Sequence, residues 1–314
     1  MQRTVCVLLS LLFASGCGKL PGAETGAGNF LGAGVAGPET SLSGYIAISE
    51  STNRTVMLFD GSMGFVRYLY QGPSGVAAEI PLGINLYDAS NIMVLIDGND
   101  RVIKNSLMAP TGLGTVLVTD VTNLVTATRG SVARLSGGDI LIVEGGTNFV
   151  ERFTSTGVRQ TTGWPLASLT APGGIDAINV GGAAGGFVHC AITSDQVRSH
   201  SSTGATLFTA VTVAAHDFID CVAHTDGRIA VALNGATDRV RIYADHTFAS
   251  FCDYSSAILL VNPLALDFKP NGNVLVWDGT NRHLLEINSA CTLVATYSNA
   301  YVSPVAVTDI MVIP

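Results

Sequence analysis

Few residues in this chain combine the types and spacing that catalysis or metal binding requires. His216 and Asp217 are adjacent, and such a pair can act as a base or as a metal ligand. A surface loop that holds both residues is the alternative. Aspartates recur at or near the expected inner strands, where they could bind a cation together or each cap a turn through its own backbone: Asp88, Asp176, Asp220, Asp267 and Asp309.

Other catalytic and metal-binding motifs do not occur in the sequence. It contains no G-x-S-x-G segment, and no complete calcium loop follows Asp97-Gly98 or Asp278-Gly279. No pair of Cys or His residues has zinc-site spacing. We therefore expect no cofactor and no bound metal.

The first residues predict export. One positive charge at Arg3 precedes an apolar run over residues 5–13 and small residues over 14–16, which is typical of a secretory signal. The run is too short to span a bilayer. Cys17 after small residues resembles the bacterial lipobox, which implies cleavage after residue 16 and lipid on the Cys17 thiol. Ordinary cleavage with a free cysteine is the alternative.

Residues 17–43 form the next segment, which begins with the lipidated cysteine. Its Gly- and Ala-rich composition cannot bury enough surface to offset the entropy lost on ordering, so it is predicted to be a flexible tether. The protein would then contact a bacterial membrane through its lipid anchor only. Gly18 after Cys17 resembles the sorting signal for the outer membrane of Gram-negative bacteria.

Four cysteines remain beyond the signal and the anchor: Cys190, Cys221, Cys252 and Cys291. In an exported domain they indicate disulfides, with three connectivities allowed. Buried free thiols are the alternative, because Cys190 and Cys221 lie inside apolar runs.

The composition excludes nucleic acid as a partner and favours short strands. The chain has 16 basic and 24 acidic residues, and its only lysines are Lys19, Lys104 and Lys269, so no basic cluster is available for phosphates. Charged residues make up 13% and hydrophobic residues 47%, with 35 glycines. Such a chain favours apolar strands joined by glycine-rich turns over amphipathic helices.

A repeat predicts the fold. A turn residue, an apolar strand, a polar turn and a second strand recur from Gly44, Asn91, Gly138, Gly186, Gly227 and Gly272, at intervals of 41 to 48 residues. This period is typical of propeller blades. We predict an all-β, six-bladed β-propeller over residues 44–314, with four antiparallel strands per blade and the C-terminal strand closing the first blade.

The last repeat resembles the NHL repeat. Residues 263–287 hold Asp267 at the end of a strand, the turn Asn271-Gly272 and the segment Asn281-Arg282-His283-Leu284 in the places where that family has its motif. The resemblance implies a propeller fold and not a reaction.

Three functions fit these features. The first is a monomeric, non-catalytic binding or scaffold protein of the cell envelope, with a protein or glycan partner. The second is a propeller enzyme of the lactonase or lyase type with a site at the channel mouth, and the third is a purely structural surface protein. Binding is expected on the face that carries the blade-to-blade links, where Trp164, Tyr254 and Tyr301 lie in or beside the links. Packing at the top of each blade is the alternative for these aromatic residues.

Overall fold

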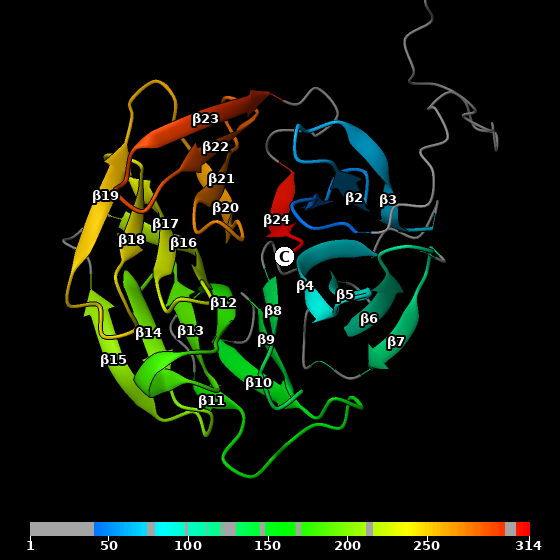
Figure 1. Ribbon diagram of the computed structural model, residues 1–314. Helices are drawn as coiled ribbons and strands as arrows, with labels where there is room; N and C mark the ends of the chain where they lie inside the picture. Colours follow the sequence, from blue (N-terminus) through cyan, green and yellow to red (C-terminus); the bar gives the residue numbers. More distant parts are fainter. Residues whose placement is uncertain are drawn as a thin grey trace, which may run out of the picture. The chain divides into compact units, whose positions relative to one another are not determined.

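The computed structural model describes residues 41–73, 79–97, 100–110, 112–119, 121, 130–144, 148–167, 171–211, 216–298 and 306–314. These residues form six four-stranded antiparallel sheets arranged as blades around a central channel (Figure 1). The predicted six-bladed propeller is therefore confirmed. The predicted signal, Cys17 and all but the last few residues of the predicted tether lie outside the described residues. Within these ranges, no helix has the length and apolarity to cross a membrane.

The six blades are numbered along the chain, each from its inner to its outer strand. Blade 1 comprises β24 (Val307–Val312), β1 (Ile46–Glu50), β2 (Thr55–Phe59) and β3 (Phe65–Gln71). Blade 2 comprises β4 (Ile80–Asp88), β5 (Asn91–Asp97), β6 (Arg101–Ser106) and β7 (Thr115–Val118). Blade 3 comprises β8 (Gly130–Arg134), β9 (Ile140–Glu144), β10 (Phe149–Phe153) and β11 (Leu166–Ala167).

The second half of the ring repeats the same order. Blade 4 comprises β12 (Pro172–Ile178), β13 (Gly186–Ala191), β14 (Gln196–His200) and β15 (Thr206–Val211), with a short 3-10 helix, η1 (Gly181–Ala183), between its first two strands. Blade 5 comprises β16 (His216–Ala223), β17 (Ile229–Gly235), β18 (Arg239–Tyr243) and β19 (Phe251–Ser255). Blade 6 comprises β20 (Pro263–Phe268), β21 (Val274–Asp278), β22 (His283–Ile287) and β23 (Leu293–Ser298).

The C-terminal strand closes the ring as predicted. β24 pairs antiparallel with β1, from Ile46 opposite Val312 to Glu50 opposite Val307. In Figure 1 the red β24 stands at the channel beside blade 1, although it follows β23 in sequence. Because β24 supplies the inner strand of blade 1, the last residues of the domain complete its first blade.

Burial follows the position of each strand within its blade. The central strands β2 and β22 are buried at every residue, whereas the outer strand β23 alternates between half-buried and exposed residues. A strand covered on both faces needs a continuous apolar run, and one covered on a single face needs alternation. The packing between blades supplies this cover: Trp277 and Leu284 of blade 6 pack with Ile48 and Phe59 of blade 1.

Polar residues of the last repeat hold a blade-to-blade link. The Asp278 carboxylate accepts hydrogen bonds from the backbone amides of Val261 and Asn262 in the link and of Thr280 and Asn281 in its own turn. The His283 ring contacts the Leu259 carbonyl oxygen at 2.8 Å. These polar residues therefore fix the link between blades 5 and 6, which is a structural role.

One disulfide is present among the described residues. Cys252 at the outer strand β19 of blade 5 is bonded to Cys291 in the turn before β23 of blade 6. Cys190 and Cys221 are buried free thiols. The disulfide thus joins two neighbouring blades near their outer strands.

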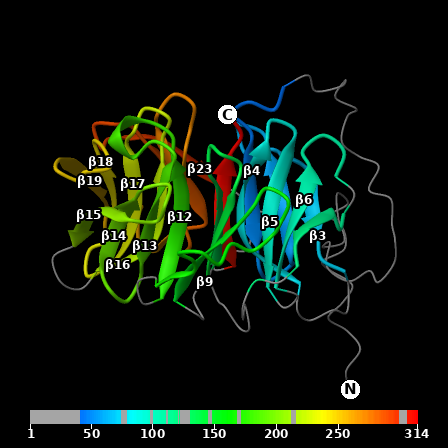
Figure 2. The same cartoon turned by 90° about the horizontal axis from the view of Figure 1, so that it is seen from below.

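The two faces of the ring differ in the connections they carry. The face that we call the link face carries the links between blades, such as residues 256–262, and the turns between second and third strands, such as residues 279–282. The opposite face carries the turns that follow the inner strands, such as residues 269–273. Figure 2 shows the strands running between these two faces.

Candidate functional site in the central channel

A cavity of about 240 Å³ lies in the channel, where the inner strands end on the face opposite the link face. We call this side the cavity face. Its apolar lining includes Ile84, Leu86, Phe268 and Met311, and the chain's last residue, Pro314, also lines it. A mostly apolar hollow with a few polar groups is the usual form of a ligand site.

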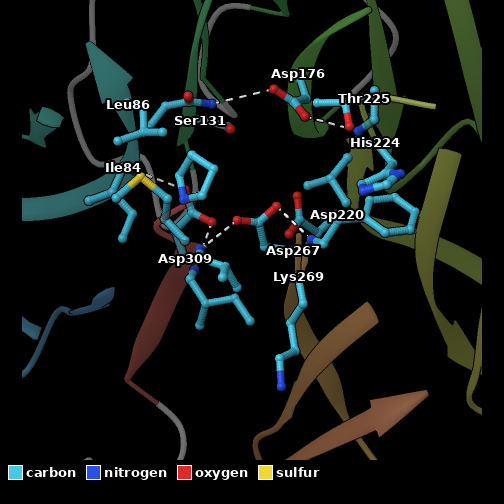
Figure 3. Close-up of a pocket in the computed structure, with 18 of the residues that line it drawn as sticks. Ile84, Leu86, Ser131, Asp176, Asp220, His224, Thr225, Asp267, Lys269 and Asp309 are labelled. Atoms are coloured by element: carbon cyan, nitrogen blue, oxygen red, sulfur yellow. Dashed lines mark hydrogen bonds between the residues drawn. The ribbon is translucent and has the colours of Figure 1, made fainter. Parts of the chain in front are cut away.

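Carboxylates form the polar part of this cavity. Four successive inner strands, β12, β16, β20 and β24, each contribute one aspartate to the lining. In Figure 3, Asp220, Asp267 and Asp309 lie close together, and Asp176 lies farther along the same cavity. The other two inner strands contribute Asn85 and Ser131. We call the four aspartates the channel ring: Asp176, Asp220, Asp267 and Asp309.

Each aspartate of the channel ring accepts two backbone hydrogen bonds. One comes from the amide of the next residue in its own strand, at 2.7 to 2.8 Å. The other comes from the inner strand of the next blade, at 2.6 to 2.9 Å. The ring thereby links blades 4, 5, 6, 1 and 2 in turn through the amides of Ala223, Leu266, Val312 and Ile84.

These contacts revise the two roles that the sequence suggested for the aspartates. Turn capping holds for Asp88, whose exposed carboxylate accepts from the Ser90 amide in the tight turn between β4 and β5. The channel ring caps no turn and instead bridges blades. Across the described ranges, no group of three or more His, Cys, Asp or Glu side chains has the arrangement of a metal site.

Burial makes the ring hard to ionise. It raises the pKa of Asp176 to about 6, against the opposing effect of the amides of Ala223 and Ala177. Burial, with repulsion from Asp220, raises the pKa of Asp309 well above its usual range, and the pKa of Asp267 is raised in the same way. Some of these carboxyl groups therefore keep a proton at pH values where exposed aspartates have lost theirs.

The basic residues at the cavity rim are directed to acids outside the channel ring. Lys269 extends away from the ring in Figure 3, and its Nζ lies 2.9 Å from Glu286. His224 Nδ1 lies 2.9 Å from Asp226, and its ring packs on Phe268 at 4.9 Å. The net charge of the lining is consequently set by the channel ring.

The predicted His216–Asp217 pair lies away from this cavity, at the start of β16 near the link face. His216 Nε2 lies 3.1 Å from the Thr237 carbonyl oxygen and 3.2 Å from a guanidinium nitrogen of Arg239. The Asp217 side chain is exposed. The fold thus does not bring the pair together with the channel ring, and the only sequence signal for the ring was an aspartate recurring near inner-strand ends.

The predicted aromatic contacts are also dispersed. Trp164 is only 7% exposed and packs near Phe187, with the Arg152 guanidinium 5.4 Å from its ring. Tyr254 lies half-buried on the outer strand β19, and Tyr301 is outside the described residues. The burial of Trp164 agrees with packing within the propeller, the alternative that the sequence left open, because its ring lies in the apolar cluster between blades 3 and 4.

Comparisons with known proteins bear on the fold alone. No protein-family model and no curated protein matches the chain. Among solved structures, a chain of a nidogen/laminin complex is similar with a TM-score of 0.65 and 10% identity, covering 85% of this chain and 97% of that chain. A streptogramin B lyase is similar with a TM-score of 0.58 and 13% identity, over 73% of this chain and 72% of the lyase. A protein of unknown function from Bacteroides caccae has a TM-score of 0.54 and 13% identity, over 85% and 97% of the two chains.

Proposed function

We propose that this protein is an exported, lipid-anchored β-propeller of the bacterial cell envelope, whose propeller is a non-catalytic binding or scaffold domain. The anchor proposal rests on the sequence around Cys17. In a Gram-negative cell, Gly18 favours the outer membrane. The proposed partner is a protein or glycan of the envelope.

The observation that carries the binding role is how the channel ring is used. All four carboxylates are occupied by backbone amides that join blades, so they serve the stability of the ring. With the ring in this structural role, the cavity that it lines and the loops of both faces remain available to a partner. The cavity face offers the hollow of about 240 Å³, with Leu86 and Thr225 on its wall.

A second candidate is an enzyme of the lactonase or lyase type. It is favoured by the pKa of about 6 for Asp176 in an open cavity, since raised carboxyl pKa values are frequent in catalytic acids. This candidate predicts that the chain turns over a lactone or another cyclic ester, and that Asp176→Asn abolishes this turnover. A chain that turns over none of these, with or without added divalent metal, would remove it.

Cell fractionation tests the anchor. The Cys17→Ser chain is expected to leave the membrane fraction, because no acyl chains remain to hold it. The matched control is Cys6→Ser, which alters the signal and leaves Cys17 in place. An unmodified Cys17 at the mature N-terminus, seen by mass spectrometry, would overturn the anchor proposal.

Capture from envelope extract tests the binding role. The soluble Cys17→Ser chain is the bait, and Leu86→Trp, which fills the cavity, is compared with Tyr254→Ala near the link face. Loss of capture in one variant, with the melting temperature unchanged, would place the partner on that side. Failure to retain any protein or glycan above the level of the heat-unfolded bait would count against binding and favour a structural role.

A further inference from the structure

Two buried thiols meet between blades 4 and 5. Cys190 lies on β13, the second strand of blade 4, and Cys221 lies on β16, the inner strand of blade 5. Neither has any exposed surface, and both belong to the apolar cluster that Val188 and Val231 form between these blades. They are the two described cysteines outside the disulfide.

Gly174 brings the two sulfur atoms together. Cys221 Sγ lies 3.4 Å from the Gly174 carbonyl oxygen, and Cys190 Sγ lies 3.8 Å from the same oxygen. The Gly174 amide also donates to Cys190 Sγ at 3.2 Å. A Cβ at position 174 would lie 2.6 Å from the Cys221 amide nitrogen, so only glycine allows the inner strands to approach this closely.

The second thiol also affects the ionisation of Cys221. Burial first, and then hydrogen bonding with the neighbouring Cys190, raises the pKa of Cys221 well above that of a free thiol. Both sulfur atoms contact the same carbonyl oxygen, so the two thiols lie in one apolar space between blades 4 and 5.

The same domain already holds a disulfide. Cys252–Cys291 joins blade 5 to blade 6, and such bonds persist in oxidising compartments. Any compartment in which that bond forms also exposes Cys190 and Cys221 to disulfide oxidants while the chain folds.

We propose that Cys190 and Cys221 are a modification site at which a second disulfide forms, joining blade 4 to blade 5. The oxidant is a small-molecule disulfide such as glutathione disulfide. One cysteine thiolate attacks it and displaces one glutathione; the other cysteine thiolate then attacks the mixed disulfide and displaces the second. The two cysteines lose two protons and two electrons, and the oxidant is reduced to two thiols.

The bond forms before the blades close. A thiol that is fully buried and hard to ionise reacts slowly, because the thiolate is the attacking species and the oxidant needs access. Oxidation therefore accompanies folding, and burial afterwards protects the bond from reductants. With Cys252–Cys291, the bond covalently joins blades 4, 5 and 6, the blades that carry Asp176, Asp220 and Asp267.

Refolding with a glutathione buffer tests the proposal. The mature Cys17→Ser chain is reduced, unfolded and refolded in reduced and oxidised glutathione, and thiols are then counted with a maleimide in denaturant. We expect no free thiol, and a Cys190–Cys221 cross-link in the non-reduced peptide map. Two free thiols per folded chain, with Cys252–Cys291 formed, would overturn the proposal.

Single variants separate this bond from the existing one. Cys190→Ser and Cys221→Ser are each expected to leave one reactive thiol, while the Cys252–Cys291 peptide remains. The matched control, Cys252→Ser, is expected to free Cys291 and keep the Cys190–Cys221 peptide. Should a variant fail to fold, the thiol count of the parent chain decides alone. The test does not depend on the anchor proposal, because the parent chain is Cys17→Ser.

Discussion

The channel ring can be tested by removing one of its links. Asp309 accepts from the Ile310 amide in its own strand and from the Ile84 amide of blade 2, each at 2.8 Å. Asp309→Ala leaves both amides without an acceptor in the channel wall. It also removes the link between the strand that closes blade 1 and the neighbouring blade.

The magnitude follows from these two amides. A buried amide without an acceptor costs about 1–3 kcal/mol, so the loss is roughly 2–6 kcal/mol in the free energy of unfolding. Part of this loss is offset, because the variant no longer buries a carboxylate beside Asp220. We therefore expect a net destabilisation of about 2–4 kcal/mol near neutral pH.

The destabilisation depends on pH with a definite sign. The pKa of Asp309 is raised in the folded state, so its contribution to stability is fully present below its unfolded pKa and is lost as pH rises through the folded pKa. The alanine variant lacks this contribution at every pH. The difference between the two proteins is thus larger at about pH 5 than at about pH 8.

Urea unfolding followed by tryptophan fluorescence measures the effect, because Trp277 is fully buried. The matched control is Asp217→Ala, an exposed aspartate on an inner strand, for which a change within about 0.5 kcal/mol is expected. Asp309→Asn keeps one acceptor oxygen, so its loss of unfolding free energy should lie between the losses of Asp309→Ala and Asp217→Ala. Equal midpoints for Asp309→Ala and Asp217→Ala would refute the bridging role.

Two further perturbations address closure and pH. Deletion of residues 306–314 should abolish cooperative unfolding in calorimetry, because β24 buries Val307, Ile310, Met311 and Val312 at about 1.5–3 kcal/mol each; a single sharp transition near the original temperature would contradict closure. His189 on β13 and His200 on β14 of blade 4 have ring centroids 4.8 Å apart, and burial lowers the pKa of His189 well below its usual range and that of His200 to about 4. Their contribution to stability is present above the unfolded pKa and lost as pH falls, so His189→Leu should reduce the slope of unfolding free energy against pH between about pH 4 and 6.5 by up to about 1.4 kcal/mol per unit. An unchanged slope in urea titrations would contradict this prediction, because it would show that the pKa of His189 does not differ between the folded and unfolded states.

The sequence by itself determined the architecture of the propeller. Apolar strands and turn residues recur every 41 to 48 residues, and this pattern is local, so each blade could be read without knowing its neighbours. Counting strands also predicted that the last strand completes the first blade, since an inner strand was missing at one end and left over at the other. The resemblance of residues 263–287 to the NHL repeat pointed to the same fold, and the contacts of Asp278 and His283 assign its polar residues a structural role.

The tertiary structure decided what depends on contacts between blades. The Asp220 carboxylate accepts a hydrogen bond from the Leu266 amide on the next inner strand. No periodicity within one blade encodes that partner. The same holds for Cys252 and Cys291, which spacing alone could not distinguish from the other pairings. Trp164 looked available beside a link, yet neighbouring blades bury it. The cavity likewise needs the closed ring, because its lining comes from inner strands of different blades that are far apart in the sequence.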